Sequence, residues 1–217
     1  MKQLILPLLI LININLLAQT TEIDEPYQKG TVENGYRVGV WHYYDSQNEL
    51  ALSFDLDANQ LIHLAKDTSS YFIYDNGWKS LKPDRQIRYL GSYYFLYDFL
   101  AMNLASTYSS NAAKENINTI LILELEFDEK GVLVQKHIIG ELKKYFEEAI
   151  LEVTESIPEY WIPAVYEGKT VRTKIAFPLI YTNKTNEKKQ PKIEDIEYDG
   201  KLMSPIKIIG YGVSVRR

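Results

Sequence analysis

Residues 141–181 read ELKKYFEEAILEVTESIPEYWIPAVYEGKTVRTKIAFPLIY, and this stretch carries the clearest structural signals of the chain. Apolar residues recur at helical spacing from Leu142 to Ile157, which predicts an amphipathic helix that Pro158 ends. A turn at Glu167-Gly168-Lys169 follows, and residues 171–180 then alternate in the manner of a β-strand. The order of helix, turn and strand predicts an α+β fold.

The residues before this helix predict a hairpin and a second helix. Residues 120–127 are strongly apolar, Asp128-Glu129-Lys130-Gly131 is a turn, and residues 132–139 return as a second strand. From Tyr93 onward, apolar residues fall on one helical face. We therefore expect residues 90–182 to form two helices packed on a three-stranded antiparallel sheet.

Residues 30–82 predict an N-terminal antiparallel β-meander. Asn34-Gly35 permits the positive φ of a tight hairpin, and strand candidates follow at residues 50–56, 61–64 and 71–74. The glycines at 30, 35 and 39, followed by Trp41 and Tyr44-Asp45, resemble a single MORN-type hairpin repeat. One copy excludes an extended repeat array.

Residues 1–19 have the layout of a secretory signal peptide. Lys2 supplies a positive charge, the run to Leu17 is largely apolar, and Ala18 is a small residue before polar sequence. An uncleaved anchor is the alternative, but about 14 helical residues reach only ~21 Å, short of the ~30 Å hydrocarbon core. We expect cleavage, no stable membrane span afterwards, a linker at residues 20–29, and a periplasmic or secreted protein.

The composition narrows the classes of function. The chain has no cysteine, which removes disulfides, thiol catalysis and lipoprotein anchoring. Its formal net charge is −5 and it has no basic stripe, so nucleic acid is not an expected partner. The three histidines, His42, His63 and His137, lie far apart, and no catalytic motif occurs. We predict a non-enzyme without catalytic residues, cofactor or metal.

Taken together and in order, the signals of residues 90–181 resemble the C-terminal domain of the TonB family. The matching pieces are Gly91-Ser92, the helix around Phe99–Leu104, the hairpin, the long helix, and Trp161-Ile162-Pro163-Ala164 with the exit Pro178-Leu179-Ile180. The proline that usually follows the family's first helix is missing at residues 107–112, and no Pro-rich spacer is present. The resemblance implies a protein-binding module used outside energy transduction.

The resemblance implies that an extended peptide, such as a segment of an outer-membrane receptor, adds to an edge strand of the sheet. The partner-binding residues carried over from the family are Val171, Arg172, Thr173, Lys174, Ile175 and Phe177. The two cations of this strand have a second interpretation, because charged residues on edge strands also block aggregation. Both interpretations stay open.

Other interpretations compete with peptide docking. The chain has 17 tyrosines, 7 phenylalanines and 3 tryptophans, so tyrosine-rich sheet faces such as Trp41 and Tyr43 suit an envelope scaffold that binds glycan or peptidoglycan. Glu124 and Glu126 share a strand face but are better explained as a solvent-exposed strand end than as an acid/base pair. Trp161 is expected to fill the gap between helix and sheet. Residues 183–217 are expected to be a polar tail that could add one more strand.

Overall fold

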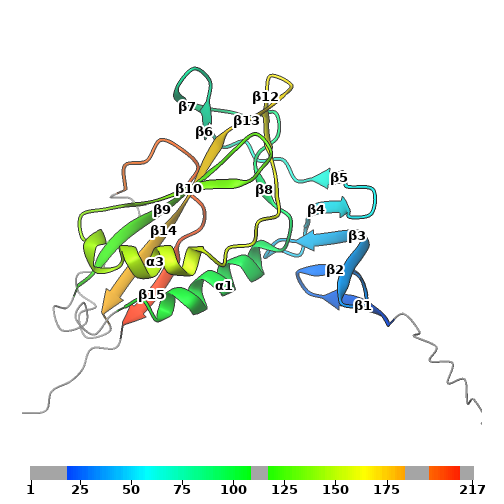
Figure 1. The fold of residues 1–217 in the computed structure, drawn as a ribbon, viewed down its shortest axis with the longest axis horizontal. Helices are drawn as coiled ribbons and strands as arrows, with labels where there is room; N and C mark the ends of the chain where they lie inside the picture. The colour runs from blue at the N-terminus through cyan, green and yellow to red at the C-terminus, as the bar shows by residue number, and fades with distance from the viewer. Residues whose placement is uncertain (1–18, 109–116, 184–195, 211–217) are drawn as a thin grey trace, which may run out of the picture.

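The computed structural model describes residues 19–108, 117–183 and 196–210 (Figure 1). The fold is mostly β, with 49% strand and 14% helix, and has a five-stranded and a six-stranded sheet. The expected signal peptide lies almost entirely outside the described residues, since the description begins at Gln19.

The five-stranded sheet is a meander in which each strand pairs with the next along the chain. Asn34 and Gly35 adopt φ of 52° and 85° in the turn that the sequence predicts. Residues 20–29, expected as a linker, instead form the first strand of the sheet, the turn after it and the start of the second strand. The strands are β1 Thr20–Glu25, β2 Gln28–Glu33, β3 Tyr36–Tyr44, β4 Leu50–Asp55 and β5 Gln60–Leu64.

The six-stranded sheet has the order β10-β9-β14-β6-β7, and the last strand, β15, pairs in parallel with β14. Two short antiparallel pairs lie outside it. They join β8 Arg88–Tyr89 to β11 Trp161–Ile162, and β12 Ala164–Tyr166 to β13 Lys169–Val171. The strands of the main sheet are β6 Tyr71–Tyr74, β7 Trp78–Leu81, β9 Thr119–Phe127, β10 Leu133–Ile139, β14 Thr173–Asn183 and β15 Ile206–Gly210.

The helices α1 Tyr93–Ala105 and α3 Glu147–Thr154 cover one face of this sheet (Figure 1). Tyr97 of α1 packs its ring 5.8 Å from that of Phe177, and Phe146, just before α3, stacks 4.1 Å from Tyr181. The continuous helix expected from 142 to 157 is wrong. Residues Lys143–Tyr145 form a 3₁₀ turn instead. We attribute the break to Phe146, whose packing on β14 takes the chain out of helical geometry.

The three-stranded sheet expected for residues 90–182 is also wrong, because the sheet has six strands. The three strands predicted there lie next to one another as β10, β9 and β14. Residues 71–81, assigned by sequence to the meander, form the β6–β7 hairpin and extend the sheet beyond β14. The tail adds β15 on the same side. Both additions come from segments remote in sequence, which local periodicity does not detect.

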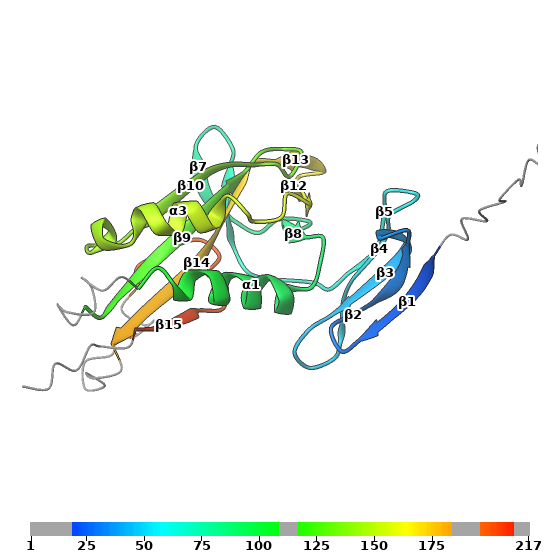
Figure 2. The same ribbon diagram turned by 60° about the horizontal axis from the view of Figure 1, so that its bottom comes forward.

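Two separate hydrophobic cores result. The larger one lies between the main sheet and its helices, and includes Trp161, which is 6% exposed and packs 4.6 Å from the ring of Phe127. The packing role predicted for Trp161 is therefore confirmed. The smaller core belongs to the meander and consists of Trp41, Tyr43, Leu52, Phe54 and, from β11, Ile162. Figure 2 shows the meander lying beside the larger unit rather than on its sheet.

Candidate functional site

The strand predicted to receive a partner peptide is an interior strand. In β14, Thr173 pairs with Phe127 of β9 on one side and Ile73 of β6 on the other. Further along, Ala176 pairs with Glu124 of β9 and forms a bridge to Leu202. Because backbone partners are present on both sides, the expectation that this strand borders the sheet is wrong.

The six predicted side chains do not form a docking surface. Thr173, Ile175 and Phe177 are fully buried. Val171 belongs to β13, where it pairs with Ala164, and the Arg172 carbonyl accepts a hydrogen bond from the Tyr74 N–H. The structure thus distributes the predicted residues among the core, a short hairpin and the opposite face of the sheet.

Arg172 and Lys174 form ion pairs inside the molecule. Arg172 pairs with Glu126, and the Lys174 Nζ lies 2.8 Å from Glu124 and 4.4 Å from the ring centroid of Trp78. Glu124 and Glu126 are 6% and 2% exposed, so their expected position at a solvent-exposed strand end is wrong. Neither cation is free for a partner or serves as edge protection.

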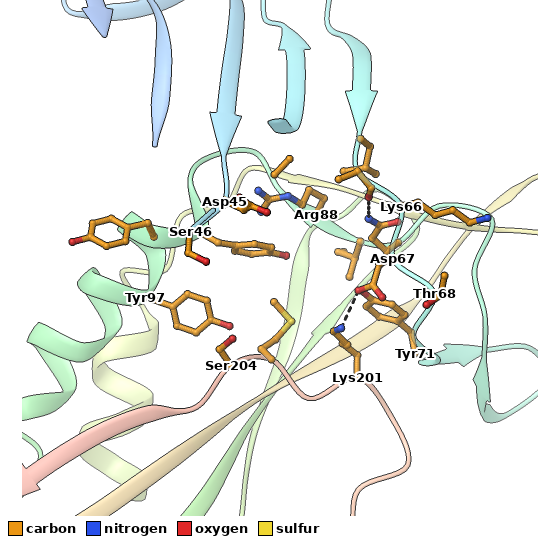
Figure 3. Close-up of a pocket in the computed structure, with 18 of the residues that line it drawn as sticks. Asp45, Ser46, Lys66, Asp67, Thr68, Tyr71, Arg88, Tyr97, Lys201 and Ser204 are labelled. Carbon is orange, nitrogen blue, oxygen red and sulfur yellow. Dashed lines mark hydrogen bonds and ion pairs between the residues drawn. The ribbon is translucent and has the colours of Figure 1, made fainter. Parts of the chain in front are cut away.

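A different place in the fold has the features of a binding site. A cavity of about 650 Å³ lies between the meander, the first turns of α1 and the segment before β15 (Figure 3). Its walls come from segments that are far apart in sequence. They are residues 44–46 and 51, 64–68, 71, 86–88, 93–94, 97 and 201–204.

Arg88 is the most deeply buried charged residue that lines this cavity. The residue is only 4% exposed, and its Nη1 has no hydrogen-bond partner among the residues that the structure describes. The guanidinium carbon lies 3.7 Å from the ring centroid of Tyr93. Among the ion pairs of the described residues, none includes Arg88. A buried cation without a counter-charge is unfavourable, because it loses its hydration without gaining an equivalent interaction.

The two acidic side chains that line the cavity, Asp45 and Asp67, each accept hydrogen bonds within the protein. In Figure 3, Arg88 reaches toward Asp45 and Ser46 of the β3–β4 turn. The Oδ1 of Asp45 instead accepts the backbone N–H groups of Gln47 and Glu49, both at 2.9 Å. Among the described residues, no ion pair joins the Asp45 carboxylate to Arg88.

Asp67 and Lys201 form a closed pair on the opposite wall. The Lys201 Nζ lies 3.0 Å from Asp67 and donates to the Ser69 Oγ at 2.8 Å. Burial by itself raises the pKa of Asp67, but hydrogen bonds from Ser69, Lys201 and Tyr71 outweigh it and hold that pKa well below its ordinary value. Asp67 is therefore ionised and its charge is balanced within the wall.

Tyrosine hydroxyls complete the polar lining. Burial raises the pKa of Tyr97 to about 12. Burial and then the hydrogen bond that Tyr71 donates to Asp67, at 2.8 Å, raise the pKa of Tyr71 well above its ordinary value. Both phenols remain protonated at neutral pH, so they act as hydrogen-bonding groups and not as bases.

The remaining sequence candidates do not converge on a site. His42 hydrogen-bonds to Ser53, His63 to the Leu50 carbonyl and His137 to Gln135, so each histidine has its own local contact. Within residues 19–108, 117–183 and 196–210, no group of three His, Asp or Glu side chains is placed to hold a metal ion. Trp41 and Tyr43, named for a glycan surface, are 1% and 0% exposed and pack in the meander core.

Comparison of the chain with protein-family models, with curated proteins and with solved structures finds no match. In the described part of the chain, neither helix has the length and apolar character of a membrane-spanning segment.

Sequence reasoning did not identify Arg88 or the cavity. The available signal is a basic residue between Ile87 and Tyr89, followed by the pair Tyr93 and Tyr97 on one helical face. An arginine flanked by apolar and aromatic residues in a short strand is unusual, because arginine is rarely fully buried without a partner. The sequence does not show that this strand closes a cavity with the meander.

Proposed function

We propose that the protein is an exported, non-catalytic binding protein that holds a ligand with an anionic group in the cavity beside Arg88. The observation that carries the proposal is the buried guanidinium with an unpartnered Nη1. Export to the periplasm or the cell surface is the part of the proposal that rests on residues 1–19 alone.

An anionic ligand would supply the interaction that Arg88 lacks. Leaving a buried charge without its partner costs about 3–5 kcal/mol. Stacking of the guanidinium on Tyr93 offsets about 2 kcal/mol of this when the pair is desolvated. The remainder favours an anion that accepts hydrogen bonds from the guanidinium, since charge-assisted hydrogen bonds are about twice as strong as neutral ones.

The surroundings support binding rather than acid or base catalysis. Asp67 is committed to Lys201, Ser69 and Tyr71, and the phenols of Tyr71 and Tyr97 stay protonated. General acid–base catalysts need a pKa near the working pH, which these groups do not have. Their fixed protonation states instead provide a constant pattern of donors and acceptors for a ligand.

Thermal unfolding in simple anions tests the proposal. At ten times the dissociation constant, a ligand stabilises the folded state by about 1.4 kcal/mol, which raises Tm by a few degrees in a chain of this size. We expect acetate, sulfate or phosphate, each at the same ionic strength as a chloride reference, to raise Tm of the wild type. The increase should disappear in Arg88→Gln.

Arg85→Gln is the matched control. Arg85 lies three residues earlier, donates from Nε to the Pro163 carbonyl at 3.2 Å, and lines a different groove. This variant should keep the anion-dependent increase in Tm even if its starting Tm is lower. Equal increases in both variants would place the anion effect elsewhere and overturn the proposal.

A further inference from the structure

We propose that the ligand of the Arg88 cavity is an organic monocarboxylate with a ring in its body. This inference rests on the proposed function and narrows it to one chemical class. Three observations support it: the balance of charged side chains around the cavity, the geometry of the Arg88 guanidinium, and the aromatic residues that line the cavity.

The charge balance favours a ligand with a single negative charge. Three basic side chains, Lys66, Arg88 and Lys201, and two acidic ones, Asp45 and Asp67, line the cavity. One negative charge on the ligand therefore leaves the wall neutral. A phosphomonoester brings close to two negative charges near neutral pH, which would leave the cavity and its ligand with a net negative charge.

The geometry of the cation favours a carboxylate. The guanidinium carbon of Arg88 lies 3.7 Å from the ring centroid of Tyr93, so the proposed ligand approaches the guanidinium at an edge that this ring leaves open. The edge presents parallel N–H groups that match the two oxygens of a carboxylate. Phosphate sites usually gather several donors, and Lys201, a partly buried cation of the same wall, already has Asp67 and Ser69 as partners.

The rest of the lining favours a ring. Tyr44, Tyr94 and Tyr97 contribute aromatic surface, and Ile87, Leu202 and Met203 contribute apolar surface. Flat rings pack well against tyrosine faces and edges, while the phenol hydroxyls still hydrogen-bond to polar substituents. The volume of about 650 Å³ falls in the range of about 300–1,000 Å³ typical of small-molecule sites.

Two sources of such a carboxylate exist: a free ring-containing acid, and the C-terminal carboxylate of a peptide that ends in an aromatic residue. Both present the same chemistry to Arg88, namely a carboxylate close to a ring. They differ in whether an amide group follows the carboxylate-bearing carbon, and a matched pair of probes distinguishes them.

Titration calorimetry on protein purified after expression of the whole chain tests the inference. The probes are phenylacetate, its neutral amide phenylacetamide, acetate, phenyl phosphate and N-acetylphenylalanine. We expect phenylacetate or N-acetylphenylalanine to bind at least tenfold more tightly than acetate and phenyl phosphate, and phenylacetamide to bind at least tenfold more weakly than phenylacetate. The tighter of the two carboxylates identifies the source.

Variants of Arg88 and Arg85 test whether the probes bind in this cavity, independently of which probe binds most tightly. Arg88→Gln should lose at least tenfold in affinity for the carboxylate. Arg88→Lys should lose less, because lysine keeps the positive charge although it lacks the paired N–H groups of a guanidinium. Arg85→Gln should bind like the wild type. Circular dichroism verifies that each variant is folded.

Two results would overturn the inference about the ligand class while leaving the proposed anion site in place. Tighter, Arg88-dependent binding of phenyl phosphate would exclude a monocarboxylate while supporting an anion site. Equal affinity of acetate and phenylacetate would exclude the ring. If the Arg88 variants change the binding of none of the probes, both this inference and the proposed function fail.

Discussion

At the scale of single residues, the basic side chains of this fold differ in whether an acidic side chain compensates their charge. Lys174 of β14 and Arg172, the residue just before β14, form ion pairs with Glu124 and Glu126 of β9, so their charges are compensated within the protein. Arg88 is more deeply buried than either of them, and within the described ranges its guanidinium has the ring of Tyr93 as a neighbour but no ion-pair partner. A cation of this kind reduces stability in the unliganded protein, and such costs are found where function requires them.

Replacing Arg88 with Met should stabilise the unliganded protein. The change removes an uncompensated buried charge and keeps an unbranched apolar stem, so we expect a gain of about 1–2 kcal/mol in the free energy of unfolding. Urea denaturation with chloride as the only added anion measures it. Arg85→Met, which removes the hydrogen bond to the Pro163 carbonyl, should instead lose about 1 kcal/mol. A loss of several kcal/mol in Arg88→Met would mean that Arg88 is compensated in the unliganded state.

At the scale of elements, the hairpin of β9 and β10 connects the main sheet to the segment that carries Trp161. Its turn contains Gly131 at φ of 81°, and the Gly131 N–H donates to the Asp128 carbonyl at 3.1 Å. A side chain at this position would collide with the carbonyl oxygen of Trp161. The turn therefore has two requirements, a left-handed backbone and close backbone packing, and glycine meets both.

Gly131→Ala should accordingly be more destabilising than Gly168→Ala. Gly168 also has positive φ, 72°, but a Cβ there meets nothing within 4 Å. We expect a loss of about 1–2 kcal/mol at Gly168 from the backbone conformation alone. At Gly131 the collision adds about 1–3 kcal/mol. Denaturant midpoints of the two variants compare these losses, and equal losses would mean that the backbone at Trp161 moves away at little cost.

The elements were easier to predict than their partners. The strands at 120–127, 132–139 and 171–180 and the helix from Tyr93 were located from alternation and helical spacing. These signals depend on which side chains one segment buries, so they are readable locally. The position of these strands in the sheet could not be read from local sequence. The strands β6 and β15 pair with β14 from segments that are about 100 and 30 residues away in sequence. The resemblance to the TonB family stays a prediction.

At the scale of the whole molecule, the protein has two hydrophobic cores of unequal size, and the cavity is lined by residues from both the meander and the larger unit. The meander core contains five buried apolar residues, one of which, Ile162, comes from β11. The main core packs both helices against the sheet and is several times larger. Local stability follows the amount of buried apolar contact, so the meander is expected to open at lower free energy than the main sheet.

Native-state hydrogen exchange should show this difference. We expect the amides of β3 and β4 to exchange with opening free energies at least about 1 kcal/mol below those of β9 and β14. The ligand proposed for the cavity would contact both units, so adding it should raise the protection of β3 and β4 more than that of β9. Equal free energies in all four strands without ligand would show that the molecule unfolds as a single unit.

The sequence by itself determined the alternating strands, the tight turns at Asn34-Gly35 and Gly131, and the helix from Tyr93. Each depends on the side-chain pattern or the backbone freedom of neighbouring residues. Only the tertiary structure decided that β14 lies inside the sheet, that Glu124 and Glu126 are buried and paired with cations, and that Arg88 lines a cavity with no ion-pair partner in the described part of the chain. These outcomes depend on contacts between residues distant in the chain, and the pattern along any one segment does not record which distant segment it will meet.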